Sequence, residues 1–207
     1  MSPRPKGRIS KSDLRGKIVE AAWEQISREG ASALSLRAIA RDLGIAAPSI
    51  YNYFADRDAL VTALILEAYE SLASHQKTAN DAVPADNLHA RLAAIGQAYR
   101  DWAVTYPQRY LLIFGTPIPG YVAPLEAVAP IAARSLSALI SVVESYHQAG
   151  RLKVVDVDIQ TIAVLIWTRV HGLVSVDISN NLPPICPTGS TLFQIEFKLI
   201  IDQFFID

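Results

Sequence analysis

Residues 35–60 carry a dense set of side chains that can hydrogen-bond to phosphates and to the edges of bases. The set combines hydroxyls, phenols, a carboxamide and guanidinium groups, which suit nucleic acid contacts better than bond making or breaking. The rest of the sequence has no nucleophile–base pair, no phosphate-binding loop and no paired carboxylates at helical spacing, so an enzyme is the remote alternative. The candidate contacts are Ser35, Arg37, Ala47, Pro48, Ser49, Tyr51, Asn52, Tyr53 and Arg57.

Short helices must position these side chains. Ser35 is a candidate N-cap for a helix of about nine residues, Gly44 supplies a turn with positive φ, and a third helix is expected over about 47–54. These are helix-turn-helix proportions, in which the outer face of the third helix enters the major groove of DNA. A three-helix motif with a purely structural role is the alternative. Gly30 is placed to end the preceding helix and Asp56 to cap the following one.

A basic arm precedes these helices. Residues 1–60 hold ten Lys/Arg and seven Asp/Glu, a net charge of +3, whereas residues 61–207 hold nine and thirteen, a net charge of −4. A basic end on a near-neutral body suggests binding to a polyanion, and a solubilising tail is the alternative. Arg4, Lys6 and Arg8 are expected to reach the minor groove or the flanking phosphates.

The remaining sequence is typical of helices, so the expected fold class is all-α with about nine helices in total. Apolar residues recur at helical spacing within each expected helix, and segments rich in Pro and Gly separate these helices. The polar stretch 75–84 reads as a linker, and residues 152–157 show the one short alternating pattern. Helices are expected over about 88–106, 110–114, 125–148, 159–176 and 192–205.

Aromatic side chains in this body suggest a cavity. Trp167 and His171 are four residues apart and so share one face of a helix. His171 either lines a pocket as its one titratable group or is a satisfied core histidine; the residues leave both open. The implied ligand is an unknown, largely apolar small molecule. The full set of candidate ligand contacts is Tyr99, Trp102, Tyr106, Tyr110, Phe114, Trp167 and His171.

No metal or cofactor is expected. The remaining histidines, at 75, 89 and 147, show no metal-ligand spacing, and Cys186 is the single cysteine.

The last two long helices are apolar on more than one side. A stripe of Phe193, Phe197, Ile200, Ile201 and Phe204 is widened by further apolar residues. Packing both helices against the same pair of a second subunit would form a four-helix bundle and a homodimer. Burial of both stripes within one subunit is the alternative.

Residues 35–60 resemble the tetracycline-repressor-like (TetR) family of bacterial transcription regulators. The matching pieces are the Ser-Leu-Arg start at 35–37, Leu-Gly-Ile at 43–45, Ile-Tyr-x-Tyr-Phe at 50–54 and Arg-Asp-x-Leu at 57–60. The resemblance implies a helix-turn-helix DNA-binding domain over 1–57 and a helical effector-binding and dimerisation domain over 58–207. It also implies a homodimer on a near-palindromic operator and release of the DNA when a small molecule binds.

The resemblance also assigns roles to single residues. It implies that Ser35 caps the second helix and touches phosphate, and that Arg37 and Arg57 contact phosphates. It places Tyr51 and Tyr53 at phosphates and base edges, with Asn52 between them.

The chain departs from the family pattern at two positions. Ala46 replaces the usual serine cap, and Pro48 replaces glycine, which leaves the base preference of Ala47 and Pro48 open. The segment Trp167–Gly172 is similar to the tryptophan–histidine–glycine signature of one branch of the family.

Composition excludes other classes. With 51% apolar and 19% charged residues the chain is not a disordered one. Uninterrupted apolar runs are short, so no membrane-spanning segment is expected, and the polar residues 1–17 do not form a signal peptide. A cytoplasmic protein is therefore expected. The resemblance to the TetR family implies that it is a repressor, with an activator or an effector-independent regulator as the alternative.

Overall fold

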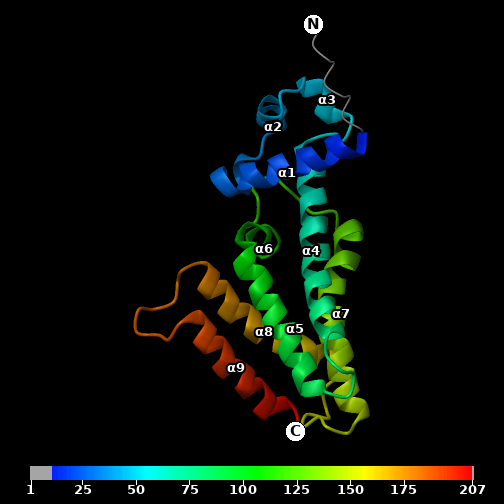
Figure 1. Cartoon of the computed structure of the whole chain (residues 1–207), viewed down its shortest axis with the longest axis vertical. Coiled ribbons are helices and arrows are strands. Elements are labelled where there is room, and N and C mark those ends of the chain that lie inside the picture. The colour runs from blue at the N-terminus through cyan, green and yellow to red at the C-terminus, as the bar shows by residue number, and fades with distance from the viewer. Residues whose placement is uncertain (1–10, 207) are drawn as a thin grey trace, which may run out of the picture.

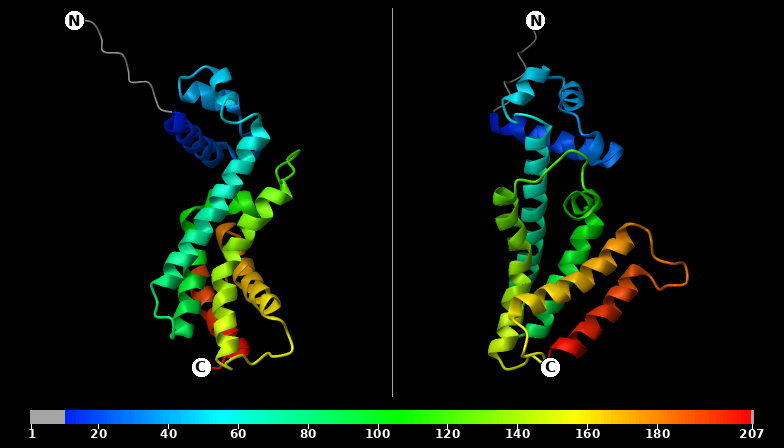
Figure 2. Two further views of the ribbon diagram at one scale, coloured as in Figure 1. Left: turned by 90° about the vertical axis from the view of Figure 1, so that its right-hand side faces the viewer. Right: turned by 180° about the vertical axis from the view of Figure 1, so that it is seen from behind.

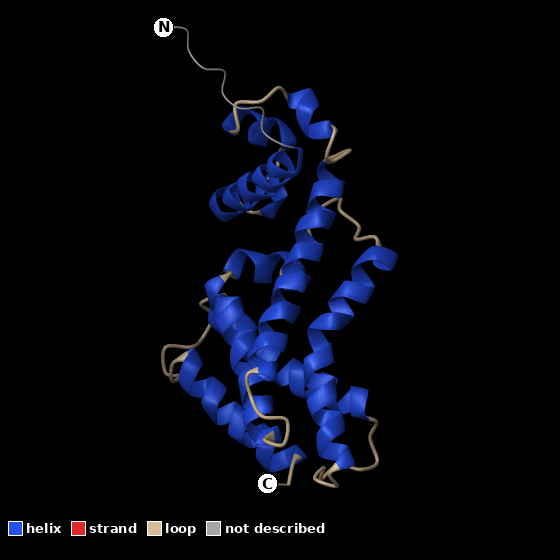
Figure 3. Ribbon diagram, turned by 45° about the vertical axis from the view of Figure 1, so that its right-hand side comes forward, coloured by secondary structure: helices blue, strands red, loops and turns tan. Residues whose placement is uncertain are grey.

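The computed structural model describes residues 11–206, so Arg4, Lys6 and Arg8 lie outside the described residues. Within this range the chain forms nine α-helices and one 3₁₀ helix and no strand, which confirms the all-α prediction (Figure 3). The alternating pattern at 152–157 yields a single antiparallel bridge between Leu152 and Phe205.

Three helices form the N-terminal part, drawn at the top of Figure 1: α1 (Lys11–Glu29), α2 (Leu36–Asp42) and α3 (Ala47–Tyr51). Gly30 and Gly44 adopt φ angles of 81° and 65°, which only glycine adopts without strain. Ser35 Oγ accepts a hydrogen bond from the Ala38 N–H, as the capping prediction requires. Helix α3 ends at Tyr51 and is shorter than predicted, because the backbone turns before Phe54.

Helix α4 (Arg57–Asp81) runs from the N-terminal part down through the body (Figure 1). Asp56 caps it, since its carboxylate accepts from the Ala59 N–H at 2.7 Å. Its first half buries Leu60 and Leu64 in the N-terminal core, and its second half buries Leu72 in the body core. The helix therefore belongs to both cores, and the predicted domain boundary at 57/58 stays a prediction.

The prediction of a linker over 75–84 was wrong for most of its length. Helix α4 continues to Asp81 because Gln76 and Asn80 are buried rather than solvated. The Asn80 carboxamide oxygen accepts from Arg91 Nε at 2.9 Å, which satisfies one of these buried polar groups.

Five helices complete the body: α5 (Leu88–Thr105), α6 (Pro107–Phe114), α7 (Leu125–Gln148), α8 (Ile159–Ile178) and α9 (Gly189–Phe204). Their boundaries lie within three residues of the predicted ones. Helices α8 and α9 pack against each other, and the right-hand view of Figure 2 shows the pair projecting away from α4 and α7. The largest fully buried side chains of the body core are Trp102, Tyr110, Tyr146, Phe205, Leu72 and Ile95.

The expectation that no segment could span a membrane was wrong by length and composition. Windows of α7 and α8 reach mean hydropathies of 1.5 and 1.4. Serines and threonines interrupt the apolar runs of these helices but lower their mean hydropathy only slightly, so the length of uninterrupted runs underestimates how apolar the helices are. Two such helices are weak grounds for a membrane protein, because core helices of soluble proteins pass the same criteria.

Candidate nucleic-acid interface and body cavity

Four of the predicted DNA contacts lie around one shallow surface depression of about 300 Å³ on the N-terminal part. Ser35 and Arg37 come from the start of α2, Tyr51 from the end of α3 and Arg57 from the start of α4. Arg37 is exposed and forms no ion pair with the part of the chain that the structure describes. An uncommitted guanidinium beside a hydroxyl and a phenol is suited to a phosphate.

Helix α3 turns a small face to solvent. Pro48, Tyr51 and Asn52 are exposed, and Tyr51 keeps 47% of its surface accessible. Ala47, Ser49 and Tyr53 are partly buried, with Ala47 and Tyr53 packed against the N-terminal core. The outward face of α3 is therefore narrower than the sequence suggests.

The caps of α2 and α3 differ. Ala46 makes no side-chain cap for α3, so the first turn is held by the backbone bond from Ser49 N to the Ala46 carbonyl at 2.8 Å. The buried Gln25 supports the start of α2, because its Oε1 accepts from the Ser35 N–H at 3.1 Å.

Arg57 has a structural role that sequence reasoning missed. Its guanidinium donates to the backbone carbonyls of Ala31, Ser32 and Leu34 at 3.2–3.3 Å. These bonds tie the start of α4 to the segment that leads into α2. The carboxylate of Asp56 also borders the depression, so the charge there is mixed.

The aromatic residues predicted to bind a ligand divide into two sets. Four of them gather around the fifth, His171, whose Nδ1 lies 2.7 Å from the Tyr99 hydroxyl and 3.1 Å from the Tyr110 hydroxyl. Trp167 stacks on the imidazole with ring centroids 4.7 Å apart, and Phe114 meets its edge at 4.9 Å.

The other two lie elsewhere. Trp102 is buried, and its Nε1 donates to Ser71 Oγ at 3.0 Å. Tyr106 packs against the ring of His75. Both are therefore outside the cluster around His171, although Tyr106 and Trp102 contact each other.

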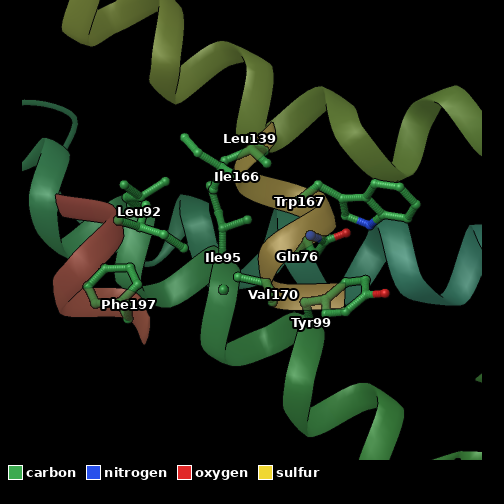
Figure 4. A pocket seen from close by; sticks show the side chains of 11 residues that line it. Gln76, Leu92, Ile95, Tyr99, Leu139, Ile166, Trp167, Val170 and Phe197 are labelled. Carbon is green, nitrogen blue, oxygen red and sulfur yellow. The ribbon is translucent and has the colours of Figure 1, made fainter. Parts of the chain in front are cut away.

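A cavity of about 30 Å³ adjoins this cluster (Figure 4). Tyr99 and Trp167 line it, whereas Tyr110, Phe114 and His171 do not. That volume holds about one water molecule, far less than a drug-sized ligand needs. Sequence reasoning missed Gln76, which lines the cavity from the stretch expected to be a linker. The other lining residues are Leu92, Ile95, Gly96, Leu139, Ile166, Val170, Phe197 and Ile200.

Burial lowers the pKa of His171 below its usual 6.5, because the imidazolium loses hydration. Burial also raises the pKa of Tyr99 and Tyr110, so both phenols stay protonated. The Nδ1 atom of a neutral imidazole can then accept a hydrogen bond from the Tyr99 hydroxyl. The histidine is thus a bonded member of the cluster beside the cavity rather than part of the cavity wall.

This pKa predicts acid sensitivity. Because the folded-state pKa of His171 is below the unfolded value, the unfolded chain binds more protons as the pH falls below about 6.5. We expect the free energy of unfolding to decrease between pH 7 and pH 5, and His171→Asn to flatten that part of the profile. Urea titrations at several pH values measure both, and an unchanged slope in the variant would assign the sensitivity to other groups.

Helix α6 joins the cavity cluster to the N-terminal part. It carries Tyr110 and Phe114, and also Arg109, which pairs with Glu67 of α4 at 3.2 Å. Trp23 of α1 donates to the same carboxylate at 3.1 Å, and the Arg109 guanidinium lies 5.1 Å from the Trp23 ring centroid. Movement of α6 would therefore reach both α1 and α4.

Most of the apolar stripe predicted on α9 is buried within the subunit. Phe193, Ile200, Ile201 and Phe204 are buried and Phe197 is partly so, which makes the single-subunit alternative correct for this stripe. The residues that widen the stripe on its flank stay exposed, with 50% of Ile195 and 48% of Leu199 accessible.

Helix α8 has a matching outer face. It exposes Leu165, Thr168, Gly172 and Val176 at helical spacing. A Cβ added at Gly172 would meet no atom within 4 Å. Since glycine destabilises a helix interior, and nothing within the subunit requires it here, the face has a backbone site open to close approach. The outer face of α8 thus carries the apolar Leu165 and Val176 with the uncharged Thr168 and Gly172 between them, and α9 adds the exposed Ile195 and Leu199.

The part of the chain that the structure describes has no group of three or more His, Cys, Asp or Glu that could hold a metal ion.

Two family models match the chain. Residues 18–64 match the tetR family of bacterial regulatory proteins, and residues 92–197 match the tetracyclin repressor-like C-terminal domain. The chain is 38% identical over 151 residues to the HTH-type transcriptional regulator Rv1816 of Mycobacterium tuberculosis, which is 73% of this chain and 64% of that protein. The chain thus spans less than two thirds of that relative's length.

Solved structures are also similar. The crystal structure of SCO4313, assigned as a regulatory protein, matches with a TM-score of 0.79 and 35% identity, over 92% of this chain and 96% of that one. The TetR family regulator PfmR from Thermus thermophilus shares the fold, with a TM-score of 0.66 at 16% identity over 90% and 98% of the two chains.

Proposed function

The chain belongs to the tetR family of bacterial regulatory proteins, and from this premise we propose that it is a DNA-binding transcriptional regulator. It binds double-stranded operator DNA as a homodimer in the cytoplasm and represses transcription until a small-molecule effector releases it. The observation that carries the proposal is the exposed face of α3, with Tyr51 and Arg37 at one depression.

The face supports a division of roles. Pro48 and Asn52 project from α3 toward base edges, with Ala47 beside them, while Ser35, Arg37 and Tyr51 bind phosphates on either side. Ser49 and Tyr53 contribute through their exposed parts, and Arg4, Lys6 and Arg8 add salt-dependent affinity.

A gel shift with DNA from beside its own gene, titrated with salt, tests the proposal. A specific shift that weakens steeply with salt is expected, and its absence at low salt would contradict DNA binding.

Arg57 gives a prediction that separates two roles. If it positions α2 through the three carbonyls, Arg57→Gln lowers the melting temperature and the operator affinity but leaves the salt slope unchanged. If it contacts phosphate, the slope falls by about one for each subunit. We expect the first result, measured by thermal unfolding and by gel shifts at four salt concentrations. Arg37→Gln is the matched control, for which the slope should fall and the melting temperature should not.

Dimerisation is proposed through the outer faces of α8 and α9. An exposed apolar surface of this kind usually marks an interface, and Arg169 holds the two helices together as one platform by bonding Glu196 and Gln203. A two-fold pairing would present the two α3 helices to half-sites about 34–36 Å apart, one turn of DNA.

The effector mechanism proposed here uses α6. A ligand that enlarges the cavity displaces Tyr99 and Trp167, and through them the cluster that includes Tyr110 and Phe114 of α6. The pair of Arg109 with Glu67 transmits this shift to α4 and α1, so the two recognition helices no longer match the operator. Equal operator affinity with and without a bound cavity ligand would count against it.

The sign of regulation depends on where the operator lies relative to the promoter, so an activator stays the alternative function. An enzyme is disfavoured because the cavity wall has no charged side chain and no nucleophile. The assignment to the tryptophan–histidine–glycine branch stays a prediction.

A further inference from the structure

We infer that the body cavity takes an uncharged, largely apolar molecule with one hydrogen-bond donor, and that Gln76 recognises this donor. The inference deepens the proposed function, since it names the chemical class of the effector. It rests on the polarity of the cavity wall rather than on DNA binding.

Among the described residues that line the cavity, Gln76 has a buried polar atom without a hydrogen-bond partner. Its side chain is 3% exposed, and its Oε1 has no hydrogen-bond partner among the described residues. A buried carbonyl without a partner costs free energy, so a donor in the cavity, from water or from a ligand, is needed to satisfy it. Figure 4 shows the amide among the side chains that line the cavity, beside Trp167 and Val170.

Two other polar residues of α4 differ from Gln76, because both have a hydrogen-bond partner within the protein. Ser71, five residues before Gln76, accepts from Trp102 Nε1 at 3.0 Å. Asn80, four residues after it, accepts from Arg91 Nε at 2.9 Å. Ser71 and Asn80 therefore have hydrogen-bond partners within the protein, whereas Gln76 Oε1, at the cavity, has none among the described residues.

The rest of the wall excludes charge. It consists of aliphatic and aromatic side chains and the backbone at Gly96, with no ionisable group except the Tyr99 phenol, whose pKa burial raises. A carboxylate or ammonium here would lose its hydration without a counter-charge. Uncharged molecules with a hydroxyl or N–H group fit both the wall and Gln76.

Phe197 explains how a molecule larger than water could enter. It lines the small cavity and also an outer depression of about 290 Å³ between α5 and α9, together with Phe193 and Gln97. Phe197 is partly buried, and its side chain borders both spaces. Rotation of this ring would join them into a volume that suits a small ligand.

Calorimetry with three probes that each carry an unbranched eight-carbon chain tests the inference on the full-length protein without DNA. We expect 1-octanol to bind at least about tenfold more tightly than 1-methoxyoctane, which lacks the donor, and than octanoate, which is charged. Equal affinities for octanol and methoxyoctane, or preferential binding of octanoate, would overturn it.

The variant Gln76→Met keeps the length of the side chain and removes the amide. It should abolish the preference for octanol over methoxyoctane and raise the melting temperature by about 2–4 °C, because the unpaired carbonyl is lost. Gln148→Leu, at an exposed position at the end of α7, is the control and should keep the preference. A preference that survives Gln76→Met would refute the role of Gln76.

The wild-type ranking of the three probes decides the chemical class even if Gln76→Met does not fold. Octanol binding without any operator binding would contradict the proposed function and leave this inference standing. Operator binding without a preference for octanol would contradict this inference and leave the proposed function standing.

Discussion

Replacing Leu165 by glutamate is expected to convert the protein from a dimer to a monomer and to weaken operator binding at least about 100-fold. Leu165 is 45% exposed in the single subunit, on the outer face of α8. A carboxylate at the centre of an apolar interface would lose its hydration without a partner, which costs several kcal/mol. A monomer holds one half-site only, and a 100-fold loss corresponds to about 2.7 kcal/mol.

Light scattering after size-exclusion chromatography measures the mass, and gel shifts measure the affinity. Val155→Glu is the matched control, because Val155 is 71% exposed in the loop before α8 and lies off the outer face. A dimer that persists in Leu165→Glu would place the interface elsewhere.

Gly172→Leu gives an independent test of the same interface. A Cβ added at Gly172 meets no atom of its own subunit within 4 Å, and leucine favours a helix more than glycine does. The subunit should therefore melt no earlier, while the dimer dissociates because the partner helix can no longer approach closely. A dimer unaffected by Gly172→Leu would mean that the interface does not use this site.

Replacing Tyr51 by alanine should weaken operator binding about 100-fold and leave the dimer and its melting temperature unchanged. The side chain is half exposed at the end of α3, and its ring contributes little to the N-terminal core. A phenol bonded to phosphate contributes about 1.5 kcal/mol, and a dimer has two of them. Because tyrosine is uncharged, the salt slope should stay constant.

Two further variants distinguish a loss of the Tyr51 hydroxyl from a loss of core packing. Tyr51→Phe keeps the ring, so a similar loss of affinity would assign the effect to the hydroxyl. Tyr53→Ala should instead lower the melting temperature, since Tyr53 packs against the N-terminal core. If Tyr51→Ala unfolds the protein, Tyr51 belongs to the core and the assigned role fails.

Local signals in the sequence predicted most of the helices. Ser35 and Asp56 cap helices because a short polar side chain can reach the free N–H groups of a first turn. Gly30 and Gly44 end helices because positive φ angles select glycine. Such effects extend over three or four residues, and the sequence displays them directly.

Long-range packing could not be predicted in the same way. The polar residues after His75 looked solvated, yet α4 buries Gln76 and Asn80 against the body. The sequence suggested that Arg57 contacts phosphate, but its guanidinium donates hydrogen bonds to backbone carbonyls more than twenty residues earlier in the chain. Spacing alone also could not separate Trp102 from Trp167, since burial depends on partners from other helices.

The positions of the three tryptophans have a spectroscopic consequence. Trp102 is buried and bonded to Ser71, so its emission should stay blue-shifted and constant as a reference. Trp167, stacked on His171 at the cavity, should change its emission when a ligand enters. Trp23 lies beside Glu67 and Arg109, where the N-terminal part meets the body. A variant that keeps only Trp167 would thus report ligand entry, and a variant that keeps only Trp23 would report the conformational change where the N-terminal part meets the body. Comparing the two signals would show whether the second event follows the first.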